Sequence, residues 1–413
     1  MTSPALSPAL LAASGFYRDP YPLYAQLRQL GAVTPAADGR WLVCGHAEVS
    51  ATLRDRRFIT TKHDTTALDP AVRGGRFFRV SDAMMLQLDP PAHTRLRALV
   101  SKSFTPRFSA EQQARIERAI DELLAPALAR GEMEVIGEFA CPLPVLVIAE
   151  LLGVPPADRA RFRAWSRELV ETNDLVRFKL SAGEIGPALI ERANTVADEF
   201  CGYLTALADE RRARPRDDLL TGLVQTEEEG DRLTRDELLA MCVLLLIAGH
   251  ETTMNLIGNG LLALLRHPDQ MDALRYPSLA AGAVEELLRY DSPVQVTIRQ
   301  AAEDIPLGGT VVPRGAEAIL LLGAANRDPA RFDRPDVLDV SRPDVQPISF
   351  GGGIHYCLGA PLARLEGRLA LHALVSRAPG LALRGDPTGA DLEWNENLAL
   401  RGVKALPITL RVR

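Results

Sequence analysis

Apolar residues recur along most of the chain at the three-to-four-residue spacing of an amphipathic helix. This spacing predicts helices over 21–30, 48–55, 92–103, 110–129, 142–152, 156–172, 185–213, 279–290 and 359–375. Alternation with a period of two, which is typical of strands, is confined to 32–43, 294–322 and 381–412. In the first of these stretches, Asp38 and Gly39 form a hairpin signal. Residues 60–88 show neither period, so we expect a functional loop there.

The strongest helical pattern lies in the second half of the chain. Thr234 and Glu237 have the spacing of a capping box, and the pattern continues to Arg266, just before Pro268. About 30 residues rising 1.5 Å each would give a rod of roughly 50 Å. Because its first half is apolar on nearly every face, we expect this helix to be buried on all sides in the middle of the protein.

Helix clearly outweighs strand, and no linker rich in Pro, Gly or Ser divides the chain. The length of 413 residues alone would suggest two or three domains. The pattern instead predicts one mainly α domain over 1–413 with a smaller β part. Its helix-rich core would cover about 90–290 and 355–378, and its β-rich part about 30–60, 294–322 and 381–412.

Composition places the chain among ordinary soluble globular proteins, since 47% of its residues are hydrophobic and 24% are charged. The net charge of −6 argues against a nucleic-acid-binding protein, which usually presents a basic face. The longest apolar run, 238–248, is too short to span a bilayer, and no Lys or Arg precedes Arg18 as in a signal peptide. We therefore expect a cytoplasmic protein without a membrane anchor.

The chain contains five widely spaced cysteines and no C-x-x-C motif: Cys44, Cys141, Cys201, Cys242 and Cys357. This usage predicts neither a disulfide framework nor a zinc site. Cys357 alone follows a glycine-rich segment and precedes a predicted helix. The N–H groups and dipole at a helix start lower a thiol pKa toward the thiolate, which is an axial ligand of haem iron. The alternative is a buried apolar cysteine on a glycine-rich turn.

Residues 350–359 read F-G-G-G-I-H-Y-C-L-G. This segment resembles, at every fixed position, the haem-binding loop F-x-x-G-x-H-x-C-x-G of the cytochrome P-450 monooxygenases. The resemblance implies haem b with Cys357 as the axial iron ligand, and cofactor contacts from Phe350, His355 and Gly359. It also implies the cytochrome P-450 fold, in which the haem lies between the long central helix and the Cys357 loop.

The long helix interrupts its apolar pattern with Gly249, Glu251 and Thr252. Buried acids are costly and glycine lowers helix propensity, so these residues point to a site. They resemble the family's oxygen-activation motif A/G-G-x-D/E-T. By that resemblance Gly249 borders the haem, and Glu251 and Thr252 are the catalytic acid–alcohol pair. An acid at a helix kink in a water-filled crevice is the alternative.

Glu286 and Arg289 stand three residues apart on one predicted helix. By themselves they would fit a solvated surface pair. They resemble the family's E-x-x-R motif, which pairs with a downstream loop behind the haem. The resemblance therefore implies a structural role for both residues.

His93 and Arg97 share one helix face at i and i+4. They resemble the family's H-x-x-x-R motif, which binds the haem propionates, whereas His93 alone would suit a capping or surface histidine. Arg299 and His355 match further propionate partners of the family.

The resemblance implies a monooxygenase that activates O₂ and inserts one oxygen atom into a lipophilic small molecule, by hydroxylation or epoxidation. Because the chain has no nucleotide-binding fingerprint, electrons from NAD(P)H would arrive through a separate ferredoxin- or flavodoxin-type donor. Its docking face should lie on the Cys357 side. Candidate cations are Arg95, Lys102, Arg107 and Arg364, although each also fits an ordinary solvated side chain. We expect a monomer.

The substrate pocket implied by the family fold is almost entirely apolar, although its members would equally suit plain core. They are Phe77, Phe78, Met84, Met85, Leu244, Ile247, Ala248, Val294, Val296, Thr297, Leu398 and Ala399. Residues 249–259 and 320–329 look most like the bacterial subgroup with macrolide hydroxylases and a biotin-pathway fatty-acyl oxidase. We therefore expect a fatty-acyl, polyketide, macrolide or terpenoid substrate, as in secondary metabolism.

Other classes stay open at this point. A haem-thiolate peroxygenase would use H₂O₂ and should lack the acid–alcohol pair, whereas Glu251 and Thr252 are present. A non-catalytic haem-binding protein would act as a sensor or carrier, and nothing in the sequence adds a signalling module. In a haem-free structural protein, Cys357 would only be buried.

Overall fold

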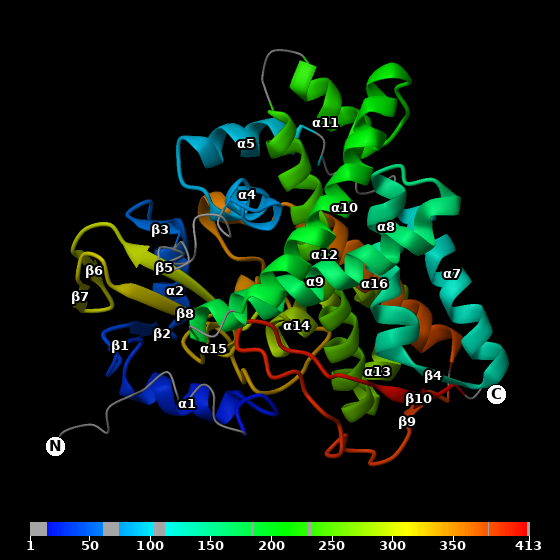
Figure 1. The fold of residues 1–413 in the computed structure, drawn as a ribbon. Coiled ribbons are helices and arrows are strands. Elements are labelled where there is room, and N and C mark those ends of the chain that lie inside the picture. The colour runs from blue at the N-terminus through cyan, green and yellow to red at the C-terminus, as the bar shows by residue number, and fades with distance from the viewer. Residues whose placement is uncertain are drawn as a thin grey trace. The chain divides into compact units, whose positions relative to one another are not determined.

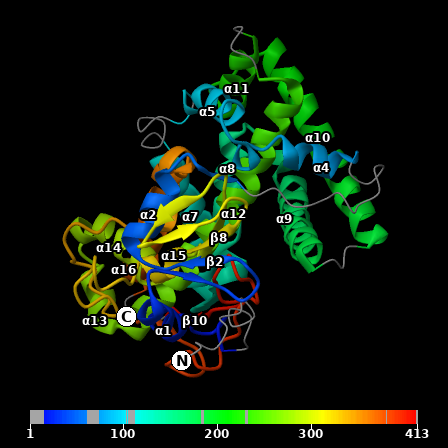
Figure 2. The ribbon, with the colours of Figure 1, turned by 90° about the vertical axis from the view of Figure 1, so that its left-hand side faces the viewer.

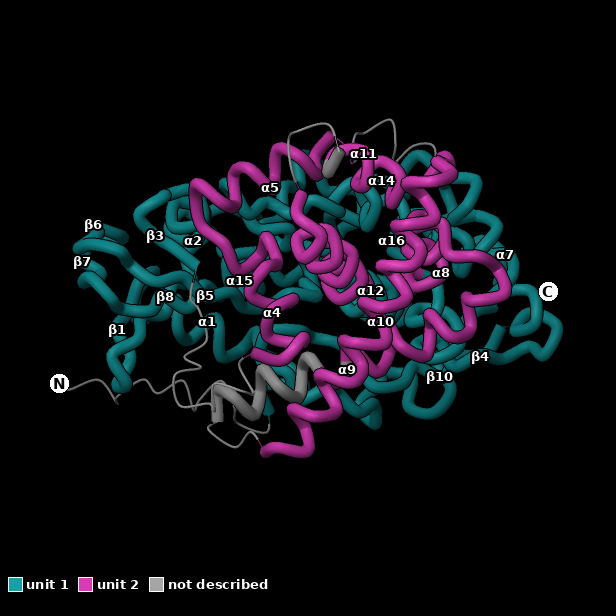
Figure 3. Tube along the Cα trace, turned by 45° about the horizontal axis from the view of Figure 1, so that its top comes forward, with its two compact units in different colours: residues 1–61, 112–143, 251–413 teal, residues 62–111, 144–250 magenta. Residues whose placement is uncertain are grey.

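The computed structural model describes residues 15–60, 74–102, 104, 112–182, 186–228, 233–378 and 380–410 (Figure 1). The chain divides into two compact units, which Figure 3 colours separately. Unit 1 comprises Met1–Thr61, Gln112–Leu143 and Glu251–Arg413, and unit 2 comprises Lys62–Glu111 and Pro144–His250. Each unit therefore combines segments that are distant in the sequence.

Unit 2 is helical throughout its described part. Its helices are α4 (Arg76–Asp82), α5 (Ala92–Ser101), α9 (Arg159–Ala182), α10 (Pro187–Ala213) and α11 (Leu219–Glu228), with α8 (Pro142–Leu151) entering from unit 1. Short 3-10 turns cover Met85–Gln87 and Pro156–Asp158. Phe77 and Phe78 of α4 pack on Ile190, Ala193 and Ala197 of α10. The apolar stripe of α10 is therefore buried by α4 in this unit.

The longest helix, α12 (Arg235–Arg266), continues from unit 2 into unit 1. Its start is the predicted capping box: Glu237 N donates to Thr234 Oγ1 at 3.2 Å, and Thr234 N donates to Glu237 Oε2 at 2.8 Å. By length and composition this helix could cross a membrane, but 61% of its most apolar window is buried inside the structure. Such burial is typical of the core helix of a soluble protein.

Unit 1 contains both helices and a five-stranded sheet. The helices are α1 (Tyr21–Leu30), α2 (His46–Arg54), α7 (Gln113–Arg130), α13 (Pro268–Ala273), α14 (Ala280–Tyr290), α15 (Leu322–Ala325) and α16 (Ala360–Arg377). Short turns of 3-10 helix cover Pro277–Leu279, Ile348–Phe350 and Gly353–His355, and a π-helical turn covers Ile136–Ala140. The last two 3-10 turns belong to the segment that carries Cys357.

The sheet has the strand order β1-β2-β8-β5-β3. The strands are β1 (Val33–Pro35), β2 (Trp41–Val43), β3 (Phe58–Thr60), β5 (Val296–Ala301) and β8 (Glu317–Leu321). Only β2 and β8 of this sheet run parallel, and Figure 2 shows the sheet beside α2. The hairpin predicted at Asp38 and Gly39 joins β1 to β2, and Gly39 has the positive φ of 85° that such a turn needs.

Alternate residues of β2 and β8 contact different helices. Leu42, Ile319 and Leu321 pack with Tyr24 and Leu27 of α1. Their neighbours Val43, Ala318 and Leu320 pack with Val49 and Leu53 of α2. Because side chains alternate along a strand, one helix covers each face of this sheet.

Two smaller sheets complete unit 1. β4 (Glu132–Glu134), β10 (Pro407–Thr409) and β9 (Ala382–Leu383) form one, and β6 (Ile305–Leu307) pairs with β7 (Thr310–Val312) in the other. The strands predicted over 381–412 are thus much shorter than expected. Isolated bridges join Trp394 to Val403 and Val294 to Leu400 instead, and residues 411–413 lie outside the described residues.

The mainly α fold with a smaller β part is confirmed, but several local predictions are wrong. The predicted loop over 60–88 contains α4 and a 3-10 turn in its described part, while 61–73 lie outside the described residues. The sequence pattern does not predict the helices α11, α13 and α15 or the strand β4, whereas β3 lies at the end of the β-rich part expected over about 30–60. Apart from α11, these elements are six residues long or shorter, too short for one period to stand out.

Candidate active site

Cys357 lies at the end of a tightly turned loop in unit 1. Gly351 and Gly353 adopt positive φ values of 71° and 63°, which favour glycine. A Cβ on Gly353 would lie 2.1 Å from the carbonyl oxygen of Leu53 in α2. Within the loop, Cys357 N donates to Phe350 O at 2.9 Å. The turns at Gly351 and Gly353, together with this backbone hydrogen bond, therefore place Cys357 beside Phe350, the first residue of the loop.

The helix that follows Cys357 begins where the sequence predicted. α16 has Gly359 as its N-cap residue and Pro361 in its first turn, so Cys357 stands two residues before the cap. Cys357 is half-buried, and a Cβ on Gly359 would meet no atom within 4 Å. A soft sulfur ligand beside a helix N-terminus, with open space at Gly359, fits the thiolate side of a haem.

The other buried cysteines have a different environment. Burial raises the pKa of the Cys44, Cys201 and Cys242 thiols to about 12, 11 and 12. These side chains therefore stay protonated and behave as small apolar groups. Cys357 differs from these three, because it is half-buried and stands two residues before the N-cap of α16, beside the open space at Gly359.

The start of the Cys357 loop is tied to α14 by a buried polar network. Ser349 Oγ donates to Leu288 O at 2.8 Å and accepts from Asn326 Nδ2 at 2.8 Å. Asn326 Oδ1 in turn accepts from Ile348 N at 2.8 Å. A satisfied buried network specifies one arrangement, because each broken bond would leave a buried polar group without a partner. The loop is thereby held in register with α14.

Glu286 and Arg289 of α14 form a fully buried ion pair. Arg289 Nε lies 2.7 Å from Glu286 Oε2, and Nη2 lies 2.8 Å from Oε1, with both side chains at 0% exposure. The remaining N–H groups of Arg289 reach the carbonyl oxygens of Asn326, Pro335 and Val337. All five donors of the guanidinium are thus satisfied, and the surface-pair alternative does not apply.

Glu286 also accepts bonds from the segment that follows α15. Asp339 N donates to Oε1 at 3.0 Å, and Arg342 Nε lies 3.2 Å from Oε2. One buried pair therefore organises an irregular stretch of chain between Asn326 and Arg342. That stretch leads directly into the Cys357 loop.

The predicted oxygen-activation residues lie in α12, which runs without a break through Gly249. Glu251 and Thr252 are half-buried in unit 1. In unit 2, a Cβ on Gly249 would lie 3.0 Å from Ile148 Cδ1 of α8. Glycine therefore permits the close approach of α8 to α12 at this position.

His93 and Arg97 lie on α5 in unit 2 at the predicted helical spacing. His93 is buried, and desolvation followed by the charge of Arg97 lowers its pKa, so its imidazole is neutral near pH 7. A neutral imidazole keeps one N–H donor for an anionic oxygen. The surface-histidine alternative does not fit this burial.

Arg299 and His355 both belong to unit 1. Arg299 sits in β5 between Thr60 of β3 and Ala318 of β8, and His355 ends a 3-10 turn in the Cys357 loop. Arg299 Nη1 donates to Ile298 O at 2.8 Å. Both side chains are half-buried.

A small apolar cavity lies within unit 2. Its volume is about 10 Å³, and Ser81 is the one lining residue with a hydroxyl. The lining residues are Phe77, Val80, Ser81, Met84, Leu169, Ala197, Val243 and Ile247. Phe77, Met84 and Ile247 were predicted from the sequence. The others were missed because helical spacing shows which face of α9, α10 or α12 is apolar, but not which faces meet.

The other predicted pocket residues are placed as follows. In unit 2, Phe78, Met85 and Leu244 are buried side chains, and Ala248 is exposed. In unit 1, Val294 bridges to Leu400 and Gln295 N donates to Ala399 O at 2.8 Å. Residues 294–297 and 398–400 are therefore side by side, with Val296 and Leu398 packed on the cluster beside α1.

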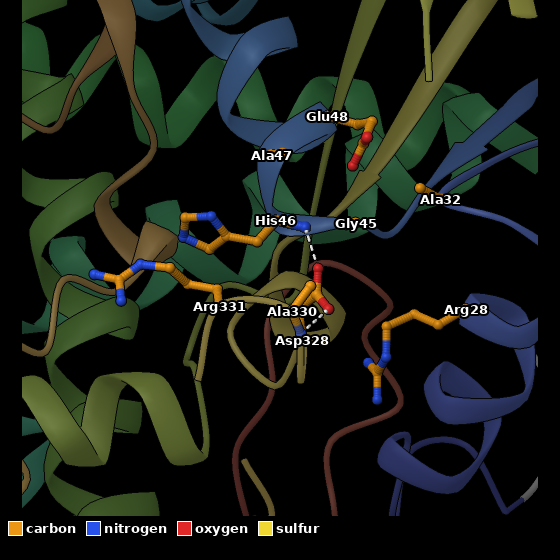
Figure 4. Close-up of a pocket in the computed structure, with 9 residues that line it drawn as sticks. All are labelled: Arg28, Ala32, Gly45, His46, Ala47, Glu48, Asp328, Ala330 and Arg331. Carbon is orange, nitrogen blue, oxygen red and sulfur yellow. Dashed lines mark hydrogen bonds between the residues drawn. The ribbon is translucent and has the colours of Figure 1, made fainter. Parts of the chain in front are cut away.

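A larger cavity of about 380 Å³ lies at the start of α2, and Figure 4 shows its lining. Three of its charged side chains, Asp328, Arg28 and Arg331, already have partners. Asp328 accepts from His46 N and Ala330 N, Arg28 donates to Ala324 O, and Arg331 lies 3.8 Å from Asp344. We assign no chemistry to it.

The predicted docking cations differ in their surroundings. Arg95 pairs with Glu237, and Arg364 makes a two-pronged contact with Glu285 at 2.5 and 3.0 Å. Lys102 is exposed, and Arg107 lies outside the described residues.

Glu366 of α16 is a buried acid that the sequence analysis did not single out. It is fully enclosed, and its Oε2 has no hydrogen-bond partner among the described residues. Burial raises its pKa from the usual 4.5 to about 8. Its neighbours Arg364 and Arg368 made this part of the helix look polar, which hid the burial.

Comparison with known proteins identifies the family. The family model described as "Cytochrome P450" matches residues 178–276 and 278–378. The cytochrome P450 monooxygenase PikC of Streptomyces venezuelae is 44% identical over 406 residues, which cover 96% of this chain and 92% of PikC. The vitamin D(3) 25-hydroxylase of Pseudonocardia autotrophica is 43% identical over 415 residues, or 98% of this chain and 96% of that protein.

Solved structures share the whole fold. P450BioI, crystallised in complex with an acyl carrier protein ligated to hexadec-9Z-enoic acid, superposes with a TM-score of 0.85 at 37% sequence identity. The match covers 97% of this chain and 100% of that one.

Removing the buried guanidinium should strongly destabilise the protein. Arg289→Ala removes the fully buried partner of the Glu286 carboxylate, whose remaining ion pair is with Arg342, and leaves the carbonyls of Asn326, Pro335 and Val337 without these donors. We expect the free energy of unfolding to fall by about 3–5 kcal/mol. Arg275→Ala is the matched control, since Arg275 pairs with Asp272 at the same spacing but near the surface, where about 0–1 kcal/mol is expected. Equal losses in chemical denaturation would contradict the role given to burial.

Glu366 should make stability fall with rising pH. The folded state keeps its proton up to about pH 8, whereas the unfolded chain releases it near 4.5, so the folded state binds more protons in this window. Glu366→Gln should therefore gain stability relative to the wild type as pH rises between these values. The exposed Glu303→Gln is the control, and thermal melting across the pH range is the measurement. A pH-independent difference would refute the assignment.

Proposed function

The chain belongs to the cytochrome P450 family, and from this we propose that it oxidises a lipophilic small molecule, by hydroxylation or epoxidation. It is a cytochrome P450 monooxygenase that depends on haem iron and O₂. Bound haem supplies the activation of O₂ and the transfer of one oxygen atom. The observation that carries the proposal is the placement of Cys357 two residues before the N-cap of α16, beside the open space at Gly359.

We propose that this chain holds the haem through residues of several elements. Cys357 would be the axial ligand, bordered by Phe350, Gly249 and Gly359. The carboxylates of the haem would receive N–H donors from His93, Arg97, Arg299 and His355. The neutral state of His93 supports this, because a buried histidine can donate one hydrogen bond without placing a second charge beside Arg97.

Glu251 and Thr252 would deliver protons. The Thr252 hydroxyl can pass a proton inward and recover one from the Glu251 carboxyl through water, because both side chains are half-buried rather than sealed. As consecutive residues of α12 they lie about 100° apart around the helix, so water would connect the two groups.

The substrate would be fatty-acyl, polyketide, macrolide or terpenoid. The unit 2 cavity has a volume of about 10 Å³, so a substrate would have to widen it, and its lining, in which Ser81 has the one hydroxyl, favours an apolar molecule. Two relatives agree in kind, since one is a vitamin D(3) 25-hydroxylase and another was crystallised with an acyl carrier protein ligated to hexadec-9Z-enoic acid. The side chains that α9, α10 and α12 contribute to the cavity lining would then select which molecular shapes bind.

Bacterial members of the family use separate redox partners, and we propose a ferredoxin- or flavodoxin-type donor for this one. Lys102 is exposed and suits an acidic partner. The guanidinium of Arg364 is already neutralised by Glu285 and suits that role less well. We further propose a cytoplasmic monomer in which residues 1–413 form one cytochrome P-450 domain.

Loss of the Thr252 hydroxyl should uncouple electron use from product. In Thr252→Ala, NAD(P)H consumption should continue with a reconstituted donor while product per NAD(P)H falls about tenfold or more. Thr252→Ser keeps the hydroxyl and should retain most of the coupling. Product and H₂O₂ are quantified per NAD(P)H, and unchanged coupling in Thr252→Ala would remove the proton-delivery role.

Filling the unit 2 cavity should weaken substrate binding. Lipophilic candidates are screened by the change of haem spin state that displacement of water produces, and Ala197→Phe should raise the Kd of the best one by about tenfold or more. Thr195→Phe adds similar bulk at an exposed position of α10 and should have little effect. Equal affinity in both variants would exclude this cavity from the substrate site.

A further inference from the structure

The guanidinium of Arg364 contacts Tyr356 and Phe350, the two residues whose backbones are joined to Cys357 by a peptide bond and by a hydrogen bond. Arg364 Nη1 donates to the Tyr356 hydroxyl at 2.9 Å, and Arg364 Cζ lies 4.4 Å from the centre of the Phe350 ring. Tyr356 is joined to Cys357 by a peptide bond, and Phe350 O accepts the Cys357 N–H at 2.9 Å. The two aromatic rings also meet edge to face, with centroids 6.5 Å apart.

Arg364 is itself held by the helix that anchors the whole region. Its Nε and Nη2 contact the two Glu285 oxygens at 2.5 and 3.0 Å. Glu285 belongs to α14, next to the buried Glu286, and α14 packs against α16 (Figure 2). The Arg364 side chain is only one-third exposed, at 33%. A two-pronged arginine–carboxylate contact fixes orientation as well as distance.

We propose that Arg364, held by Glu285, is a positioning residue that keeps the Cys357 sulfur in the geometry of a thiolate ligand. This proposal rests on the proposed haem-thiolate function. We call this group the Tyr356 clamp; it consists of Arg364, Glu285, Tyr356 and Phe350. The clamp contacts the loop at its first residue, Phe350, and at Tyr356, the residue before the cysteine. Cys357 then has little freedom to turn its sulfur away or to exchange thiolate for thiol ligation.

The clamp competes with the simpler expectation that Arg364 is a docking cation for the electron donor. The two roles need different properties of the side chain. Docking needs a positive charge, which lysine also supplies, whereas the clamp needs the planar fork that serves Glu285 and Tyr356 together. Arg364→Lys therefore separates them. Tyr356→Phe separates them again, because it changes no charge and removes a single hydroxyl.

The experiment uses the haem-containing protein, reduced and bound to CO, in mild denaturant. It follows the rate at which the Soret band of thiolate-ligated haem is lost. We expect Arg364→Lys to raise this rate about tenfold and Tyr356→Phe about threefold, since each removes hydrogen bonds of the clamp. Arg368→Ala, which removes a cation one turn further along α16, should leave the rate unchanged. The KM for the electron donor should be unchanged in Tyr356→Phe.

Two results would overturn the proposal. One is an unchanged rate of band loss in both Arg364→Lys and Tyr356→Phe. The other is an equal increase in Arg368→Ala, which would show a general loss of stability. Failure of the proposed function itself would look different, because the wild-type protein would then lack the thiolate-type band before any denaturant is added.

Discussion

The buried charge pair of Glu286 and Arg289 constrains more of unit 1 than any other contact described above. A guanidinium at 0% exposure must have an acceptor for every N–H group. The carbonyls of Asn326, Pro335 and Val337 supply these acceptors, so an irregular stretch of chain has one arrangement available. The same α14 holds Ser349 through Leu288 O and Arg364 through Glu285. The position of the Cys357 loop therefore depends on its contacts with α14.

Local signals made much of this structure predictable from the sequence. The capping box at Thr234, the hairpin at Gly39 and the glycine loop before α16 each need only neighbouring residues to form. Where partners are distant, prediction was weaker. Asp272 and Arg275 have the same spacing as Glu286 and Arg289, yet one pair is partly exposed and the other sealed. Nothing in a window of four residues distinguishes them.

The wrong predictions have the same physical cause, which is that contacts between residues distant in the sequence decide the local structure. Alternation over 381–412 predicted long strands, but Trp394 and Leu400 find single-bridge partners in Val403 and Val294, and only β9 and β10 form ladders. The lining of the unit 2 cavity includes Leu169 and Ala197, on helices whose pairing the sequence did not reveal. The cysteine loop was therefore predicted in outline, while the lining of the unit 2 cavity was predicted only in part.

The central claim is that Cys357, placed by α14 and α16, is the ligand of haem iron. The most direct test is the absorption spectrum of the reduced, CO-bound protein, recorded for the wild type and for Cys357→Ser under the same conditions. We expect the red-shifted Soret band of thiolate-ligated haem in the wild type and its loss in a folded Cys357→Ser variant. A wild-type protein without that band, or a variant that keeps it, would show that Cys357 is not the ligand of haem iron.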